Sequence, residues 1–247
     1  MTSLKVHLLW KKEEIDDLQM NEDKIAVVFD VLLATSTITT CLAYGAKQVT
    51  PVLNEKEALE EAEVMEEDDV CLVGERDGIT IKGFLDPVPL YLKNHIAGKK
   101  VVLSTTNGTV AIRKAANAKK VYMASLLNGE AVARRLIERY DNESIVVVCS
   151  GSNNSFCIED LYGAGYFIDQ LVSGYSHEQV DLTDSAMAAK LFYENLSDQS
   201  ENVLRKSHVG KMMAAYGVEN EVEFVSRKGI LSVVPRLFDG KTIVAED

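Results

Sequence analysis

The chain has 247 residues, 47% of them hydrophobic and 26% charged, and its formal net charge is −12 (26 basic minus 38 acidic residues). These totals are typical of an ordinary globular protein and exclude a disordered chain. The acidic balance argues against a nucleic-acid partner, which needs a basic surface. It still allows a small anionic ligand at a local site that contains a divalent cation.

The first residues, MTSLKVHLLWKKEE, do not show the cationic stretch and long apolar run of a targeting segment. No apolar run reaches membrane-spanning length, so we expect no membrane partner. The four cysteines form no CxxC pair and lie in or near apolar segments. We therefore expect a cytoplasmic protein with free thiols.

Apolar, β-branched runs alternate with amphipathic stretches along the chain. The runs predict strands at 6–9, 25–29, 49–53, 70–73, 101–103, 121–124 and 145–149. The amphipathic stretches predict helices at 34–44, 55–66, 109–117, 129–140, 158–173, 181–196 and 201–216, and the tail at 221–244 is typical of strand and turn. Strands that are apolar throughout, spaced by helices, predict an α/β fold with a mostly parallel sheet between two helical layers.

No linker rich in Pro, Gly or Ser divides the chain, which contains only four prolines. We therefore expect a single α/β unit over residues 1–247. Two similar lobes, 1–117 and 118–247, are a hypothesis for its subdivision. A homodimer is a hypothesis that no motif supports.

Five of the predicted strands end in small, polar or charged residues just before a helix. The segments that follow them read DVLLATSTITT, ERD, TTNGT, LLNGE and SGSNNSFCIED. In open α/β sheets, ligands bind outside the carboxyl ends of the strands, and helix N-termini there present free N–H groups to anions. We therefore predict an anion site formed by these segments.

Each segment also has an ordinary structural interpretation. A carboxylate after a strand can belong to a turn, hydroxyl residues can cap a helix, and acidic residues in a first helical turn favour the helix dipole. The residues open to such interpretations are Asp30, Thr35, Ser36, Thr37, Arg76, Ser150, Glu159, Asp160 and His208. We favour a site because the segments occur together and because a buried carboxylate is costly unless it is paired.

Several phosphate chemistries do not fit the sequence. An aspartyl-phosphate enzyme uses a second Asp two positions after the nucleophile, where this chain has Leu32. A cysteine phosphatase loop would need an arginine at Ser155, and neither a Walker loop nor GxGxxG occurs. The four histidines, at 7, 95, 177 and 208, lack the spacing of zinc ligands, whereas carboxylates and hydroxyls suit Mg²⁺.

A series of motifs, in order along the chain, resembles the 2-phosphosulfolactate phosphatases, which are Mg²⁺-dependent acid phosphatases. The motifs are DVLLATST at 30–37, GER at 74–76, TTNGT at 105–109, LN with AVA at 127–133, SGS at 150–152, ED with AG at 159–165, and SHVGK at 207–211. None of them is specific alone, but together they extend from residue 30 to the tail. The resemblance implies an α/β fold and hydrolysis of a phosphate monoester of a small anionic C3 acid, ideally 2-phosphosulfolactate.

On this resemblance, we predict that Mg²⁺ is held directly or through water by Asp30, Glu75, Glu159 and Asp160. The predicted catalytic residues are Asp30, Arg76 and Asp160, with Arg76 against the phosphoryl oxygens. The predicted substrate-binding residues are Thr35, Ser36, Thr105, Thr106, Asn107, Gly108, Ser150 and Gly151. Direct attack by water and an aspartyl phosphate on Asp30 both remain open.

Two departures from the family pattern lie at positions that could contact substrate. Leu33 stands where the family usually has arginine, and GFLDPVP at 83–89 stands where it usually reads GFDxGNSP. A substrate with three anionic groups needs several cationic or N–H donors, and Arg76, Lys82 and Arg227 could compensate. The alternatives are a phosphatase for another small phosphorylated hydroxy acid, or a non-catalytic protein that binds small anions.

Overall fold

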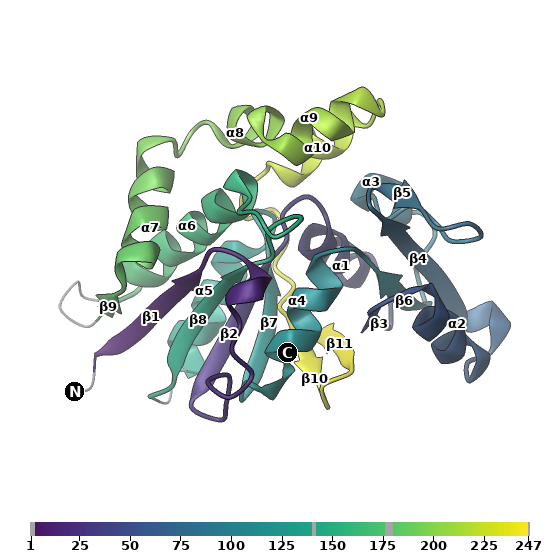
Figure 1. The fold of residues 1–247 in the computed structure, drawn as a ribbon, viewed down its shortest axis with the longest axis horizontal. Helices are drawn as coiled ribbons and strands as arrows, with labels where there is room; N and C mark the ends of the chain where they lie inside the picture. Colours follow the sequence, from purple (N-terminus) through teal and green to yellow (C-terminus); the bar gives the residue numbers. More distant parts are fainter. Residues whose placement is uncertain (1–2, 140–141, 176–179, 247) are drawn as a thin grey trace.

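One eleven-stranded sheet forms the centre of the computed structural model, which describes residues 3–139, 142–175 and 180–246 (Figure 1). Its strands follow the order β5-β4-β6-β3-β11-β10-β7-β2-β8-β1-β9. Their bounds are β1 Leu4–Leu9, β2 Lys24–Phe29, β3 Gln48–Val52, β4 Val70–Arg76, β5 Ile79–Thr80, β6 Lys100–Ser104, β7 Lys120–Ala124, β8 Ser144–Cys149, β9 Val180–Leu182, β10 Pro235–Phe238 and β11 Thr242–Ala245.

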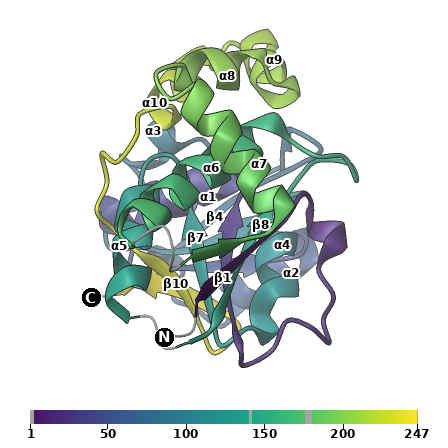
Figure 2. The same ribbon diagram turned by 90° about the vertical axis from the view of Figure 1, so that its left-hand side faces the viewer.

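The helices cover both faces of the sheet. Their bounds are α1 Ala34–Ala43, α2 Glu55–Glu63, α3 Pro89–Leu92, α4 Gly108–Lys114, α5 Gly129–Arg139, α6 Ile158–Ser173, α7 Asp184–Asn195, α8 Ser200–Lys206, α9 His208–Ala215 and α10 Glu219–Val225. Helices α5, α6 and α7 contact β7, β8 and β1 respectively, on the face that Figure 2 shows from the side. Helices α1 and α4 contact β7 and β2 respectively and belong to a second core. The predicted three-layer α/β fold is confirmed.

Strand β2 shows how the sequence produces this layering. Its side chains alternate between the two cores: Ile25, Val27 and Phe29 pack on one face, and Ala26 and Val28 on the other. Because both faces of a parallel strand are covered, every position must be apolar, and the run IAVVF satisfies this. The strand therefore ends where the first charged residue follows.

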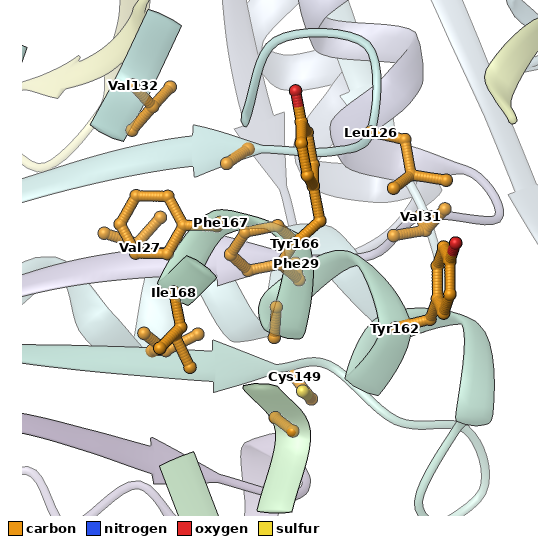
Figure 3. Close-up of a cluster of buried hydrophobic side chains, with 14 of the residues drawn as sticks. Val27, Phe29, Val31, Leu126, Val132, Cys149, Tyr162, Tyr166, Phe167 and Ile168 are labelled. Atoms are coloured by element: carbon orange, nitrogen blue, oxygen red, sulfur yellow. The ribbon is translucent and has the colours of Figure 1, made fainter. Parts of the chain in front are cut away.

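The core beneath the site is packed by helix α6 (Figure 3). The rings of Phe29 and Phe167 lie 5.8 Å apart, and Tyr162 and Val31 fill the adjacent space. At Gly163, an added Cβ would lie 2.7 Å from Cγ2 of Val31, so only glycine lets α6 approach the segment after β2 this closely. Packing therefore fixes the position of that segment.

The sheet contains two parallel groups that run in opposite directions. Strands β4, β6 and β3 are parallel to one another, as are β7, β2, β8, β1 and β9. The hairpin β10–β11 pairs antiparallel with β7 on one side and with β3 on the other. It reverses the strand direction and joins the two groups. Strands β1 and β2, which precede residue 118, pair with β8 and β7, which follow it. The boundary between the two parallel groups therefore does not coincide with the predicted lobe boundary, and the two lobes stay a prediction.

All seven predicted strands are confirmed, but three other predictions differ. The predicted helix at 181–196 starts within β9, and α7 begins only at Asp184. The predicted helix at 201–216 is divided at Ser207, whose extended backbone ends α8 and whose Oγ accepts the N–H of Gly210 at 2.9 Å to cap α9. The tail contains the helix α10 before its two strands. Tyr140, at the end of a predicted helix, lies outside the described residues. Within the described ranges, the helices are all too short or too polar to cross a bilayer.

Replacing Gly165 by alanine should destabilise the fold by roughly 1–3 kcal/mol. An added Cβ would meet the carbonyl oxygen of Ala189 and would lie 2.8 Å from Cβ of Tyr193, so α6 and α7 would have to separate. Chemical unfolding monitored by circular dichroism measures the loss. Met187→Ala on the exposed face of α7 is the control and should change stability by less than about 0.5 kcal/mol. Equal losses for both variants would contradict this packing argument.

Candidate functional site

A cavity of about 500 Å³ lies where several strand ends meet helix α9. Its polar lining comes from the segments after β2, β6 and β8 and from β4. Its apolar lining comes from the segment after β2, from β5 and from α9 and the residues after it. The residues that line it include Asp30, Leu33, Glu75, Asp77, Ile79, Asp86, Thr105, Thr106, Asn107, Ser152, Asn153, His208, Val209, Met212, Tyr216 and Val218.

Asp30 is the first residue after β2, and its carboxylate lies close to the start of α1 and to the TTNGT segment. Its Oδ1 accepts the N–H of Ala34 at 3.4 Å, while its backbone exchanges two hydrogen bonds with the hydroxyl of Thr35 at 2.9 and 3.1 Å. At Gly108 an added Cβ would lie 2.5 Å from Oδ2 of Asp30. Glycine at that position therefore allows the TTNGT segment to reach this carboxylate.

Asp160 lies in the first turn of α6, behind the cavity lining. Its Oδ1 accepts the N–H of Val31 at 2.8 Å, and its Oδ2 accepts the N–H of Gly151 at 3.1 Å. These bonds join the ends of the neighbouring strands β2 and β8. The side chain therefore fixes two of the predicted segments relative to each other.

Glu159, the preceding residue, connects α6 to the start of α9. Its carboxylate is buried and receives a hydrogen bond from the side chain of Ser207, and His208 exerts a favourable charge interaction on it. His208 itself lies in the cavity wall. The ED motif and the SHVGK motif, 47 residues apart in the sequence, therefore meet at the site.

Glu75 faces the cavity from β4 and orders the segment after β6. Its Oε1 accepts the N–H of Thr106 at 2.7 Å, and its Oε2 accepts the hydroxyl of Thr106 at 3.0 Å and the N–H of Gly78 at 2.7 Å. The Thr106 hydroxyl also accepts the N–H of Asp77 at 2.8 Å. Glu75 and Thr106 thus form one connected polar network.

The three carboxyl groups after β2 and at the start of α6 are buried close together. Desolvation by burial, with repulsion from Glu75, raises the pKa of Asp30 from 3.8 to about 7. Burial, with repulsion from Asp30 and Glu159, also raises the pKa of Asp160 well above its usual value, and burial raises that of Glu159. The site concentrates more negative charge than its surroundings neutralise.

Lys12 is a site residue that the sequence analysis missed. It is buried, and its Nζ donates to Oδ1 of Asn107 at 2.8 Å and pairs with Glu13 at 3.0 Å. Its charge acts to lower the pKa of Asp30, against the larger effect of burial. Lys12 comes three residues after the end of β1. The search for polar residues after strand ends did not include this strand, and it would have identified Lys12.

Several predicted substrate-binding hydroxyls already have partners in the fold. The hydroxyl of Thr35 donates to the carbonyl of Asp30 and that of Ser36 to the carbonyl of Val31, at 2.9 and 2.8 Å. The Thr105 hydroxyl accepts the N–H of Thr109, in the first turn of α4, at 3.1 Å. Of the predicted binding residues, Thr105, Thr106 and Asn107 line the cavity, whereas Thr35, Ser36, Gly108, Ser150 and Gly151 lie behind the lining.

Ser150 is the exception among these hydroxyls. Its Oγ is fully buried and has no hydrogen-bond partner, although it lies between β8 and the loop that carries Gly151. Gly151 adopts a φ of +64°, and an added Cβ there would lie 2.5 Å from the carbonyl oxygen of Ser155. A buried hydroxyl without a partner is rare, and this one belongs to the residue before Gly151, whose N–H bonds Asp160.

The predicted cations do not reach the cavity. The side chains of Arg76 and Lys82 are exposed and absent from the lining, and Arg227 pairs with Glu223 at 2.8 Å on the surface. Contact of Arg76 with a phosphoryl group therefore stays a prediction. In the part of the chain that the structure describes, the lining contains neither lysine nor arginine.

One of the five predicted strand-end segments serves another purpose. Asn128, after β7, is buried and accepts the N–H of Ser125 while donating to the carbonyls of Met123 and Val233 at 3.2 Å. It anchors the C-terminal segment and does not line the cavity. His177 lies outside the described residues, and across those residues no cluster of three or more His, Cys, Asp or Glu side chains has the arrangement of a metal centre.

Comparison with known proteins agrees with the motifs that meet here. Residues 10–240 match the family described as 2-phosphosulpholactate phosphatase. Proteins named probable 2-phosphosulfolactate phosphatase are similar over nearly their full length: one from Clostridium perfringens at 37% identity (98% of this chain, 97% of the other) and one from Thermotoga maritima at 38% (91% and 94%). A third, from Clostridium beijerinckii, is 34% identical over 96% of this chain and 98% of its own.

In metal-free protein, Asp30→Asn should raise the free energy of unfolding at pH 8 and much less at pH 5. Because the folded-state pKa of about 7 lies above the unfolded value of 3.8, folding stability conferred by the protonated carboxyl is lost as pH rises towards and through 7. The gain of the variant over the natural protein should increase by roughly 2–3 kcal/mol between these pH values. Urea unfolding in EDTA measures it, and a gain that does not depend on pH would contradict the assignment.

Proposed function

The chain belongs to the 2-phosphosulfolactate phosphatase family, and on this basis we propose that it hydrolyses the phosphate ester of a 2-phosphosulfolactate-like acid with the help of Mg²⁺. The family consists of phosphoric monoester hydrolases. Hydrolysis breaks the ester P–O bond, adds the oxygen of water to phosphorus, and returns a proton to the departing alkoxide. The products are the hydroxy acid and inorganic phosphate.

The observation that carries this proposal is the charge of the cavity. Four carboxylates line it, from Asp30, Glu75, Asp77 and Asp86, and its described lining contains no lysine or arginine. A phosphate ester is itself anionic, so binding it beside these groups would be strongly unfavourable without a cation. A divalent cation between carboxylates and phosphoryl oxygens resolves the repulsion.

The residues present fit Mg²⁺ in the way that phosphoryl-transfer sites usually hold it. Mg²⁺ is commonly bound by one or two carboxylates, water and substrate phosphate, so a preformed cluster of three side chains is not required. Asp30 and Glu75 both line the cavity and repel each other, and they are the carboxylates we assign to the ion. When bound, the ion would supply charge neutralisation at the phosphoryl oxygens.

The protein side chains would orient the substrate and manage the proton. Lys12 is buried and donates to Asn107 of the lining, and we assign its positive charge to support the phosphoryl group from behind that residue. His208 is the imidazole in the cavity wall, and we assign it to protonate the departing alkoxide, with Glu159 and Ser207 fixing the start of its helix. Asp160 holds the backbone after β2 and β8. Asp30 lines the cavity, and we assign it either to orient the attacking water or to attack phosphorus itself.

Removal of divalent cations should abolish phosphate release, and Mg²⁺ should restore it. The purified chain is treated with EDTA, dialysed and assayed for inorganic phosphate released from 2-phosphosulfolactate. Glu75→Gln should lower kcat/KM at least a hundredfold in saturating Mg²⁺, because it removes an assigned ligand. Glu60→Gln on the exposed face of α2 is the control and should keep full activity. Full activity in EDTA would refute the metal assignment.

Lys12→Met should lower kcat/KM for phosphate release by roughly tenfold to a hundredfold. The substitution keeps an apolar stem of similar length but removes the charged hydrogen bond to Asn107, and a bond of this kind is worth about 1.5–3 kcal/mol. Lys5→Met, at an exposed position of β1, provides the matched control. Thermal unfolding of both variants shows whether the folded state is retained, and unchanged activity in folded Lys12→Met would exclude Lys12 from the site.

A further inference from the structure

We propose that the preferred substrate is the phosphate monoester of a 2-hydroxycarboxylic acid whose side chain is apolar, so that an alkyl or aryl group takes the place of the sulfonate. This inference rests on the proposed phosphatase activity and concerns only which ester the cavity selects. Its basis is a group of apolar side chains, the apolar wall, that lines the cavity together with the carboxylates.

Segments far apart in the sequence form this wall. Leu33 comes from the loop after β2, Ile79 from β5, and Val209, Met212 and Tyr216 from α9 and the residue after it. The two sides touch: an added Cβ at Gly78 would lie 3.3 Å from Sδ and Cε of Met212. The turn between β4 and β5 and helix α9 therefore enclose one apolar space together.

The wall is exposed to an extent that core packing does not explain. Ile79 has 68% of its surface exposed and Tyr216 has 62%, although both line a cavity. Large apolar side chains that gather in a concave surface with a few polar groups are typical of ligand sites. An apolar substituent would cover these side chains when substrate binds, whereas a sulfonate would leave them exposed.

A sulfonate would also lack partners at this wall. It would need cationic or N–H donors, but the family's usual arginine is replaced by Leu33, and the described lining contains neither lysine nor arginine. Placing an anionic group against apolar side chains without such donors carries a large desolvation cost. The carboxylate and phosphoryl groups can instead be held at the polar end, near Asn107 and the assigned metal ligands.

The cavity has room for such a group. About 500 Å³ falls in the range of pockets that hold drug-sized molecules, and a phosphorylated three-carbon acid would fill only part of it. Each additional buried methylene should raise kcat/KM roughly fourfold, from the free energy of burying apolar surface. An isobutyl or benzyl side chain should therefore be favoured over methyl by more than tenfold.

The test compares phosphate esters of 2-hydroxy acids that differ only in the side chain: sulfomethyl, methyl, isobutyl and benzyl. Phosphate release in Mg²⁺ gives kcat/KM for each ester. The inference expects the isobutyl or benzyl ester to exceed the sulfomethyl ester, 2-phosphosulfolactate, by at least tenfold. A preference for the sulfomethyl ester would overturn the inference while leaving the phosphatase function intact. Failure to hydrolyse any of the four would overturn the proposed function itself.

Variants of the wall separate selection from general loss of activity. Leu33→Arg should raise kcat/KM for the sulfomethyl ester and lower it for the isobutyl ester, since it supplies the missing cation in the same wall. Met212→Ala should reduce the isobutyl-to-methyl ratio at least threefold, and Met187→Ala on the exposed face of α7 should leave the ratio unchanged. Competitive inhibition by the free hydroxy acids gives a second measure, in which the compounds compared need not themselves be hydrolysed. An unchanged ratio in folded Met212→Ala would overturn the inference.

Discussion

The two hydrogen bonds accepted by the carboxyl group of Asp160 support the whole floor of the cavity. They hold the N–H groups of Val31 and Gly151, and so they fix the ends of β2 and β8 against each other. Without the carboxyl group both donors would be buried and unpaired, which is costly for each of them. Asp30 lies directly before Val31 in the chain, so a side chain outside the lining determines where the lining carboxylate lies. The position of the chemistry depends on this one contact.

The same arrangement explains why the site retains charges that weaken the fold. Burial raises the pKa of the three carboxyl groups, and repulsion between carboxylates raises it further at Asp30 and Asp160. Lys12 is a buried cation that opposes these effects at Asp30. A structure selected for stability alone would replace them with apolar or neutral residues. Perturbed carboxyl groups beside a cavity are instead typical of sites where charge is neutralised on binding. The cost to stability and the affinity for a cation have the same physical origin.

The sequence alone predicts seven of the strands, since each is an apolar run that stops at a polar residue, but not β5 or β9. It also predicts Asp30, Glu75 and Thr106 at one site. It does not predict which hydroxyls remain free, because Thr35, Ser36 and Thr105 are engaged by backbone groups that only the folded loops bring near. Asn128 matches the same pattern as the site segments, yet it anchors the tail. A pattern identifies where polar groups gather, while their partners depend on the tertiary fold.

The C-terminal hairpin β10–β11 affects the shape of the site although none of its residues lines the cavity. Four strands, β3, β11, β10 and β7, separate β6 from β2, so in a flat sheet their ends would lie roughly 24 Å apart at the usual strand spacing. The hairpin also reverses the strand direction, which would place the carboxyl ends at opposite edges. Yet Gly108, four residues after β6, contacts Asp30, directly after β2. The sheet must therefore twist and coil strongly between the two groups, and the hairpin that joins them sets how closely the two walls of the cavity approach.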